Sequence, residues 1–123
     1  MKHKILILED NTDLRHILIE FFSENGIKAL GAETTKEAMS IYNENNSEIK
    51  LFIIDLWLPD GNGMDFLKTV RKKSNTSPAI IMSSVITEDV RRIGKQLGVV
   101  AYFEKPFDLY ALREKVKGAI GPN

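Results

Sequence analysis

Short apolar runs alternate with amphipathic segments along this sequence, and that alternation restricts the folds open to it. Residues 5–8 (Ile-Leu-Ile-Leu) and 51–54 (Leu-Phe-Ile-Ile) are apolar at every position, which is typical of strands buried on both faces of a sheet. Three further runs, residues 27–32, 79–82 and 99–103, complete a set of five expected strands. The run 27–32 is the weakest, so we expect it near a sheet edge.

The segments between these runs carry apolar residues at helical spacing, as Leu14, Leu18 and Phe22 do in the first. Residues able to cap a helix precede them, and Gly26 and Gly98 stand where two of them should end. We expect helices to begin at residues 11–12, 34–35, 64, 87–88 and 108 and to end near residues 26, 43, 73, 98 and 120. The segment 56–63 is expected to be a loop.

Strict alternation of strands and helices indicates an α/β fold in which helices cover both faces of a parallel sheet. Right-handed crossovers make such a sheet doubly wound. The length of 123 residues suits a single domain over residues 1–123, without an internal linker. The predicted fold class is therefore a doubly wound, five-stranded parallel sheet.

Composition excludes several classes of function. Seventeen basic residues balance seventeen acidic ones, which leaves no basic footprint for direct nucleic acid binding. The absence of cysteine rules out disulfides and thiol catalysis and suits a reducing compartment. No apolar stretch approaches the roughly 20 residues of a membrane span, and the start is too short for a signal peptide. We expect a cytoplasmic protein with no membrane association.

Polar residues follow four of the expected strands at their carboxyl ends, where the functional crevice of such sheets lies. They are Glu9-Asp10, Asp55, Ser83 and Lys105. Two unit charges about 4 Å apart repel by roughly 4 kcal/mol at an effective dielectric of about 20. Three carboxylates in one small site therefore need counter-charges, and Lys105 supplies one. A divalent cation is the natural source of the rest, and all-oxygen ligands favour Mg²⁺ or Mn²⁺ over zinc.

Such a site suits phosphoryl transfer, in which an aspartate can act as nucleophile and form an aspartyl phosphate. A nearby hydroxyl and ammonium would hold the transferred oxygens. In this order and on these strand ends, the pieces resemble the receiver domain of bacterial two-component response regulators, over essentially the whole chain. The matching pieces are Glu9-Asp10, Asp55 with the loop Leu58-Pro59-Asp60-Gly61-Asn62-Gly63, Ser83-Ser84, and Tyr102 with Lys105-Pro106-Phe107.

The resemblance implies the flavodoxin-like strand order 2-1-3-4-5 and a Mg²⁺ site, with Mn²⁺ as an alternative ion. Asp10 and Asp55 would bind the ion directly, and Glu9 would act largely through water. The backbone carbonyl of Trp57 would complete the protein ligands.

The resemblance also implies that Asp55 accepts a phosphoryl group from the phosphohistidine of a sensor histidine kinase or phosphotransfer protein. Ser83, a serine where threonine is commoner, would hydrogen-bond this group, and Lys105 would pair with it. Tyr102 would change rotamer on activation. Trp57, which is large for its position, is hypothesised to slow hydrolysis of the phosphoryl group.

The resulting switch would act at the surface formed by the expected helix 87–98, strand 99–103 and helix 108–120. An effector domain, a downstream protein or, on phosphorylation, a second copy would bind there. The chain would then be no enzyme in the usual sense, but a signalling switch that assists its own phosphorylation and dephosphorylation.

Other interpretations stay open. A Mg²⁺-dependent aspartyl-phosphate phosphatase of the haloacid-dehalogenase class normally has a second acid two residues after the nucleophile, where Trp57 stands. A flavodoxin-like cofactor binder would place phosphate where Glu9-Asp10 would repel it. A phosphorylation-independent interaction module is the remaining rival. Taken singly, Ser83, Tyr102 and Lys105 are explained as well by strand packing and a solvated turn.

Overall fold

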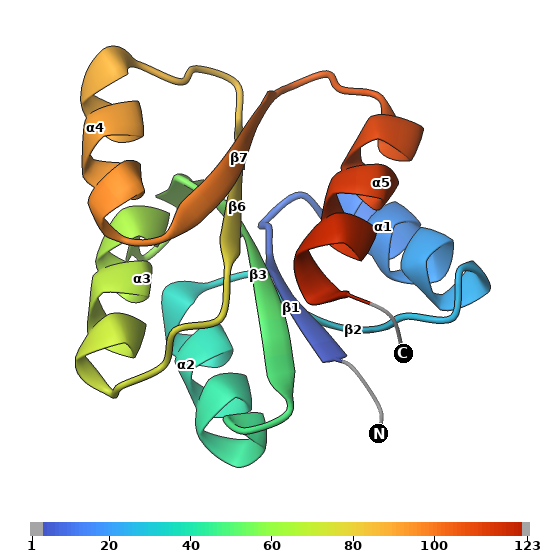
Figure 1. Cartoon of the computed structure of the whole chain (residues 1–123), viewed down its shortest axis with the longest axis horizontal. Coiled ribbons are helices and arrows are strands. Elements are labelled where there is room, and N and C mark those ends of the chain that lie inside the picture. The colour runs from blue at the N-terminus through green and yellow to red at the C-terminus, as the bar shows by residue number, and fades with distance from the viewer. Residues whose placement is uncertain (1–3, 122–123) are drawn as a thin grey trace.

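The computed structural model describes residues 4–121, in which five parallel strands form one sheet (Figure 1). The strand order is β2-β1-β3-β6-β7, which in chain order of the sheet strands is 2-1-3-4-5. Both the α/β class and this order are confirmed, with the weak second strand at an edge. The strands are β2 (Lys28–Ala32), β1 (Lys4–Leu8), β3 (Ile49–Asp55), β6 (Ala79–Ser83) and β7 (Val99–Glu104).

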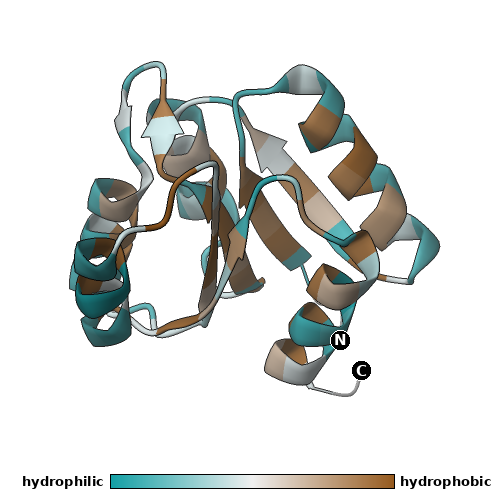
Figure 2. Cartoon of the chain, turned by 90° about the horizontal axis from the view of Figure 1, so that it is seen from above, coloured by the Kyte–Doolittle hydropathy of each residue, from teal (hydrophilic) through white to brown (hydrophobic). Residues whose placement is uncertain are grey.

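Helices cover both faces of the sheet, and the strands between them are largely hydrophobic (Figure 2). One face packs against α1 (Thr12–Glu24) and α5 (Leu109–Ile120) through Leu18, Phe22 and Leu112. The other face packs against three helices, which are α2 (Thr35–Asn45), α3 (Gly63–Lys72) and α4 (Glu88–Gln96). The central strand β3 is buried from Leu51 to Asp55, because both of its faces are covered.

Side-chain oxygens cap the helices at the starts that the sequence indicates. The caps of the five helices are Asn11, Thr34, Asn62, Thr87 and Asp108, each accepting a backbone N–H of the first turn. Gly26 and Gly98 follow the ends of α1 and α4 at φ of 76° and 78°. Glycine suits these positions because it adopts the left-handed conformation without steric cost.

Two expectations are wrong in detail. The segment 56–63 is not a plain loop: β4 (Trp57–Leu58) and β5 (Gly61–Asn62) pair as an antiparallel hairpin. Its turn has only two residues, Pro59 and Asp60, which lets the flanking residues pair at once. Helix α2 also continues through Asn45 rather than breaking at residue 43. Within the described part of the chain, no helix combines the length and apolar character needed to cross a membrane.

Candidate functional site

Four strands of the parallel sheet end at one edge and bring the polar residues of the sequence prediction together there. Asp55 ends β3 and Ser83 ends β6, while Glu9-Asp10 follows β1 and Lys105 follows β7. The carboxylates of Glu9, Asp10 and Asp55 each offer an oxygen, and these oxygens lie within 4.8 Å of one another. The three acids therefore form one cluster.

Two of the three carboxylates are withdrawn from solvent. Glu9 is fully buried and Asp55 is 5% exposed, whereas Asp10 is exposed. The Lys105 ammonium bridges the buried pair, because its Nζ lies 2.7 Å from Asp55 Oδ2 and 2.5 Å from Glu9 Oε1. Buried charges are tolerable only when they are paired in this way.

Glu9 accepts hydrogen bonds at both its carboxylate and its backbone carbonyl. Its Oε2 accepts the backbone N–H of Asn11 at 2.9 Å, and its backbone carbonyl accepts Arg15 Nη1 at 2.9 Å. Burial raises the pKa of Glu9, against the opposing effect of its hydrogen bonds with Lys105 and Asn11. Both carboxylate oxygens thus have partners within the protein, which suits an indirect role toward a cation.

Lys105 keeps its charge despite being largely enclosed. Burial by itself lowers the pKa of this ammonium, but its hydrogen bonds to Asp55 and Glu9 outweigh that effect, so that the pKa is raised. The cluster therefore holds one fixed positive charge at neutral pH.

Ser83, the last residue of β6, has a side chain without a hydrogen-bond partner. Its Oγ is buried and finds no hydrogen-bond partner among the described residues, while its backbone carbonyl accepts the N–H of Lys105 at 2.8 Å. A buried hydroxyl without a partner is costly, on the order of 1 to 3 kcal/mol. Such a group is expected where a ligand supplies the missing bond.

The donor set fits a hard divalent cation. Three carboxylates face one ammonium, so the cluster carries an excess of negative charge. All of its candidate ligand atoms are oxygens, the preference of Mg²⁺ and Mn²⁺. The acidic cluster could therefore hold such an ion.

Comparison with known proteins identifies the family. The chain matches the model of the response regulator receiver domain over residues 5–117. It belongs to this family. The sporulation initiation phosphotransferase F of Bacillus subtilis (strain 168) is 30% identical over 117 residues, which cover 95% of this chain and 93% of that protein.

Longer relatives and a solved structure agree with this. The transcriptional regulatory protein PmrA of Pectobacterium parmentieri is 33% identical over 120 residues, which are 98% of this chain but 53% of that protein. The chain spans about half the length of most of the curated regulators it matches. The non-phosphorylated HemR receiver domain from Leptospira biflexa has a TM-score of 0.90 at 30% identity, covering 99% of this chain and 97% of that one.

Two of the expected site residues in this receiver domain keep their side chains away from the acidic cluster. Trp57 is 63% exposed, and its backbone N–H donates to Asp55 Oδ1 at 3.2 Å. Tyr102 lies against α4, where its hydroxyl donates to the carbonyl of Arg91 at 3.1 Å. The side chains of Glu9, Asp10, Asp55 and Lys105 meet at the cluster, and Ser83 stands at the end of the neighbouring strand β6.

Gly63 is a site residue that the sequence prediction missed. A Cβ on this first residue of α3 would overlap the backbone carbonyl of Asp55 and the side chain of Ile54. Its N–H donates to the carbonyl of Leu56 at 2.9 Å. Gly63 therefore lets α3 begin directly against the backbone of the receiver's central acid. The sequence prediction placed Gly63 at the end of the loop that carries the family resemblance and gave it no role of its own.

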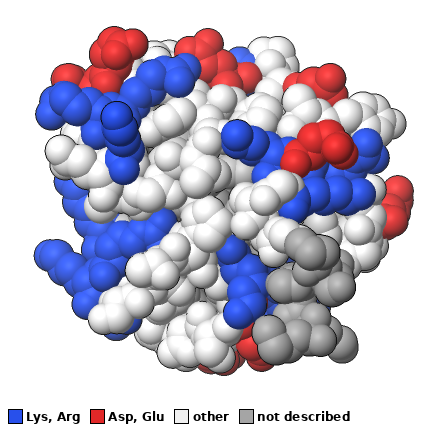
Figure 3. All heavy atoms as spheres, in the orientation of Figure 1, with Lys and Arg blue, Asp and Glu red and all other residues white. Residues whose placement is uncertain are grey.

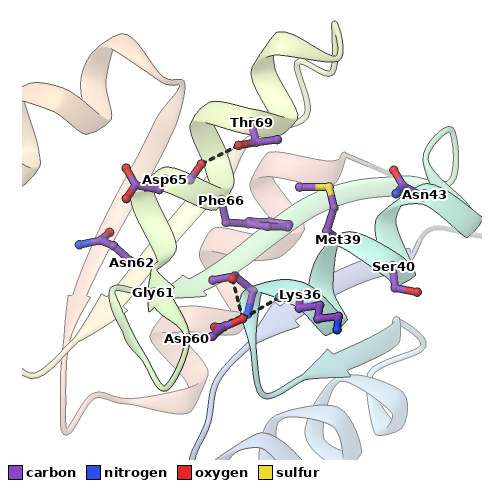
Figure 4. A pocket seen from close by; sticks show the side chains of 11 residues that line it. Lys36, Met39, Ser40, Asn43, Asp60, Gly61, Asn62, Asp65, Phe66 and Thr69 are labelled. Carbon is purple, nitrogen blue, oxygen red and sulfur yellow. Dashed lines mark hydrogen bonds between the residues drawn. The ribbon is translucent and has the colours of Figure 1, made fainter.

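Two pockets of this receiver have none of the three clustered acids in their lining. One of about 620 Å³ lies between α2 and α3, and Asp60 on its rim is hydrogen-bonded to the start of α2 (Figure 4). A second, of about 420 Å³, borders the site through Lys105 and is otherwise mainly apolar. Its remaining lining residues are Leu14, Ile17, Pro106, Phe107 and Leu109.

Proposed function

We propose that this receiver domain is the phosphoacceptor of a two-component signalling system. Asp55 accepts a phosphoryl group from a phosphohistidine of a sensor histidine kinase or phosphotransfer protein, in a Mg²⁺-dependent reaction. The observation that carries the proposal is the meeting of three carboxylates around the nearly buried Asp55, with Lys105 as their only described cation partner. A purely structural ion pair needs one acid for one lysine.

In the transfer, a carboxylate oxygen of Asp55 forms the new O–P bond while the P–N bond of the donor breaks. The electron pair of that bond returns to the imidazole, which then takes a proton from solvent. Lys105, 2.7 Å from Asp55 Oδ2, is close enough to pair with a transferred oxygen. The unpartnered hydroxyl of Ser83 would donate to another, which supplies its missing bond.

Glu9, Asp10, Asp55 and the backbone carbonyl of Trp57 would hold Mg²⁺, or Mn²⁺ in its place. When bound, the ion would offset the negative charge of the carboxylates and phosphoryl oxygens. Asp10 is exposed and free to reorient toward such an ion. Glu9 has both oxygens engaged, which supports the water-mediated role.

The phosphodonor must approach Asp55 from outside, past the rim of the site. The apolar pocket next to Lys105 and the exposed Ile17, at 50% exposure, offer that partner a surface adjoining the reacting atoms. Exposed apolar side chains beside a charged site are characteristic of interaction surfaces.

Phosphorylation would then switch the surface of α4, β7 and α5. The modification adds a charge of about −1.5 to −2 and three acceptor oxygens. These oxygens would compete with Glu9 and Asp55 for Lys105 and would offer Ser83 the hydrogen bond that its hydroxyl lacks. Basic side chains gather on the side where α3 and α4 lie (Figure 3), among them the exposed Arg91, Arg92 and Lys95 of α4. An effector domain, a downstream protein or a second copy with acidic groups would bind there. The chain so acts as a switch that assists its own phosphorylation and dephosphorylation.

The test is to incubate the protein with Mg²⁺ and acetyl phosphate and to measure its intact mass. We expect a single acid-stable, base-labile phosphoryl adduct that is absent in Asp55→Asn. The matched control is Asp65→Asn, which changes an exposed acid of α3 and should leave the adduct in place.

Two results would contradict the proposal. Consumption of acetyl phosphate without an aspartyl adduct would favour a phosphatase. Neither adduct nor Mg²⁺ binding would favour an interaction module that works without phosphorylation.

A further inference from the structure

Tyr102 occupies a well-defined place on α4. Its hydroxyl donates to the carbonyl of Arg91 at 3.1 Å, and the Arg91 guanidinium carbon lies 4.9 Å from the ring centroid. Burial raises the pKa of this hydroxyl, against the opposing effect of Arg91. The ring is thus held between the surface of the helix and a cation, rather than lying free in solvent.

Gly94 makes this position possible. A Cβ on Gly94 would overlap the Tyr102 hydroxyl oxygen and would lie 3.1 Å from Tyr102 Cζ and 3.2 Å from Val99 Cγ2. Gly94 is the one buried residue among those of α4, all of which the structure describes. Glycine is unfavourable within a helix, so its presence at the seventh of the nine positions of α4 calls for a reason. The ring of Tyr102 fills the space that a side chain would take.

We propose that Gly94 is a socket that holds Tyr102 on α4 in the unphosphorylated protein and thereby sets how readily the receiver switches. The socket itself depends only on the contacts of Tyr102, whereas its link to switching rests on the proposed function. It assigns to Gly94 a positioning role for the switch residue.

The end of β6 near Ser83 offers the ring of Tyr102 a second position. Tyr102 pairs in register with Ile81 on β6, and Ser83 follows two residues later on the same face of the sheet. A hydrogen bond from Ser83 to a phosphoryl group would draw its hydroxyl toward the acidic cluster. The ring can move toward that end of β6 only by giving up the Arg91 carbonyl and the socket.

The consequence follows from linkage between two states. A substitution that destabilises the outward position of Tyr102 raises the population of the alternative state before any modification. A ligand that prefers the alternative state then binds more tightly, by at most the factor by which the population rises. Gly94→Ala should therefore move the receiver part of the way to its switched state.

The first test reads Tyr102 directly, by ¹⁹F NMR of protein labelled with 3-fluorotyrosine. The chain has three tyrosines, and Tyr102→Phe assigns the resonance of Tyr102. We expect Gly94→Ala to shift this resonance without any ligand. Gly118→Ala is the matched control, because it also changes a helical glycine but its Cβ would meet no described atom within 4 Å. An unchanged Tyr102 resonance in Gly94→Ala overturns the socket.

The second test uses thermal stability and does not depend on labelling. Alanine is the better helix former, so Gly118→Ala should raise Tm in any background. Gly94→Ala should lower Tm in the wild-type background but raise it in a Tyr102→Ala background, where the ring no longer fills the socket. Equal changes in Tm in the two backgrounds would overturn the proposal, because the cycle isolates the contact between residues 94 and 102.

The third test measures the link to the acidic site through binding of beryllofluoride with Mg²⁺, a mimic of the aspartyl phosphate. We expect Gly94→Ala to bind about three- to tenfold more tightly than the wild type, and Gly118→Ala to bind equally. An unchanged affinity in Gly94→Ala overturns the link between socket and switch. Failure of the wild type itself to bind would instead overturn the proposed function, and the NMR and Tm results would still decide on the socket.

Discussion

Helices α3 and α4 cover the same face of the sheet (Figure 1), yet they are attached to it in different ways. Helix α3 buries five residues, which are Gly63, Met64, Phe66, Leu67 and Val70. Helix α4 buries Gly94 alone, and its apolar residues Val90, Ile93 and Leu97 are only partly covered. Hydrogen bonds from other elements also attach α4 to the molecule. Arg71 Nε donates to the carbonyl of Leu97 at 2.8 Å, and the Tyr102 hydroxyl donates to the carbonyl of Arg91.

Under the proposed function, this difference would separate the phosphoryl chemistry at Asp55 from the output surface at α4. Helix α3 begins against the backbone of Asp55, so any movement of α3 would displace the carboxylate on which the chemistry depends. Helix α4 has no fully buried large side chain that a shift would have to displace. Segments with few buried apolar contacts are the ones that open at low free energy. A rigid α3 and a loosely held α4 are what a switch needs.

The largest expected effect comes from truncating one apolar side chain in each helix. Leu67→Ala removes a fully buried side chain of α3 and should lower the free energy of unfolding by about 3 kcal/mol. Ile93→Ala in α4 should cost roughly 1.5 kcal/mol, because Ile93 is only partly buried. Urea denaturation measures both. Equal losses would contradict the contrast between the helices.

Next in size is the effect of Trp57 on the phosphoryl group. If its exposed indole hinders the approach of the water that hydrolyses the phosphoryl group, Trp57→Asn should shorten the lifetime of the Asp55 adduct by about tenfold. This corresponds to a decrease of about 1.4 kcal/mol in the activation free energy of hydrolysis. Hydrogen exchange of the α4 amides should not change, because Trp57 lies on the hairpin leading into α3. The control is Tyr110→Asn, an aromatic residue of equal 63% exposure on α5. An unaltered dephosphorylation rate in Trp57→Asn would refute this role.

A smaller effect is expected from Arg71, which joins the two helices. It lies in the last turn of α3, and its Nε donates to the carbonyl of Leu97 at the end of α4. Arg71→Gln should lower the free energy of unfolding by about 1 kcal/mol and should speed hydrogen exchange in α4 more than in α3. Lys72→Gln, an exposed neighbour on the same helix, is the control. Unchanged exchange in α4 would mean that other contacts hold this helix.

Periodicity and strand ends were enough to predict the sheet, its helices and the grouping of Glu9, Asp10, Asp55, Ser83 and Lys105. The reason is physical: buried strands need continuous apolar runs, and parallel strands deliver their carboxyl ends to one edge. These rules act on residues near one another in the sequence or at equivalent positions of repeated units. They do not depend on how any single side chain packs.

The features that escaped prediction depend on contacts between distant residues. The bonds of Asp60 with Thr35 span 25 positions, and the fit of Tyr102 over Gly94 depends on how α4 lies on β7. The sequence prediction gave Gly94 no role, because nothing local distinguishes a socket from a weak helix position. The hairpin β4–β5 was missed because its strands, at two residues each, are too short to show a period.

The smallest expected effect concerns Asp60, which fastens the hairpin beside α3 to α2. Its carboxylate accepts the N–H of Thr35 and of Lys36 and the Thr35 hydroxyl, at 2.8, 3.0 and 2.8 Å. These hydrogen bonds, the Thr35 N–H first among them, lower the pKa of Asp60 in the folded protein. A lowered pKa stabilises the fold at pH values above the unfolded pKa of about 3.9. That contribution is lost as the pH falls through the lower, folded value.

Asp60→Asn should therefore lower Tm at neutral pH, because an amide cannot accept all three bonds as a carboxylate does. The difference in Tm from the wild type should shrink as the pH falls below about 4, where the wild-type carboxylate takes up its proton. Thermal scans between neutral and acidic pH measure this, with Asp65→Asn on the same rim as control. A difference that stays constant with pH would show that the charge of Asp60 does not fasten the hairpin. The rigidity of the α3 side would then rest on its buried residues alone.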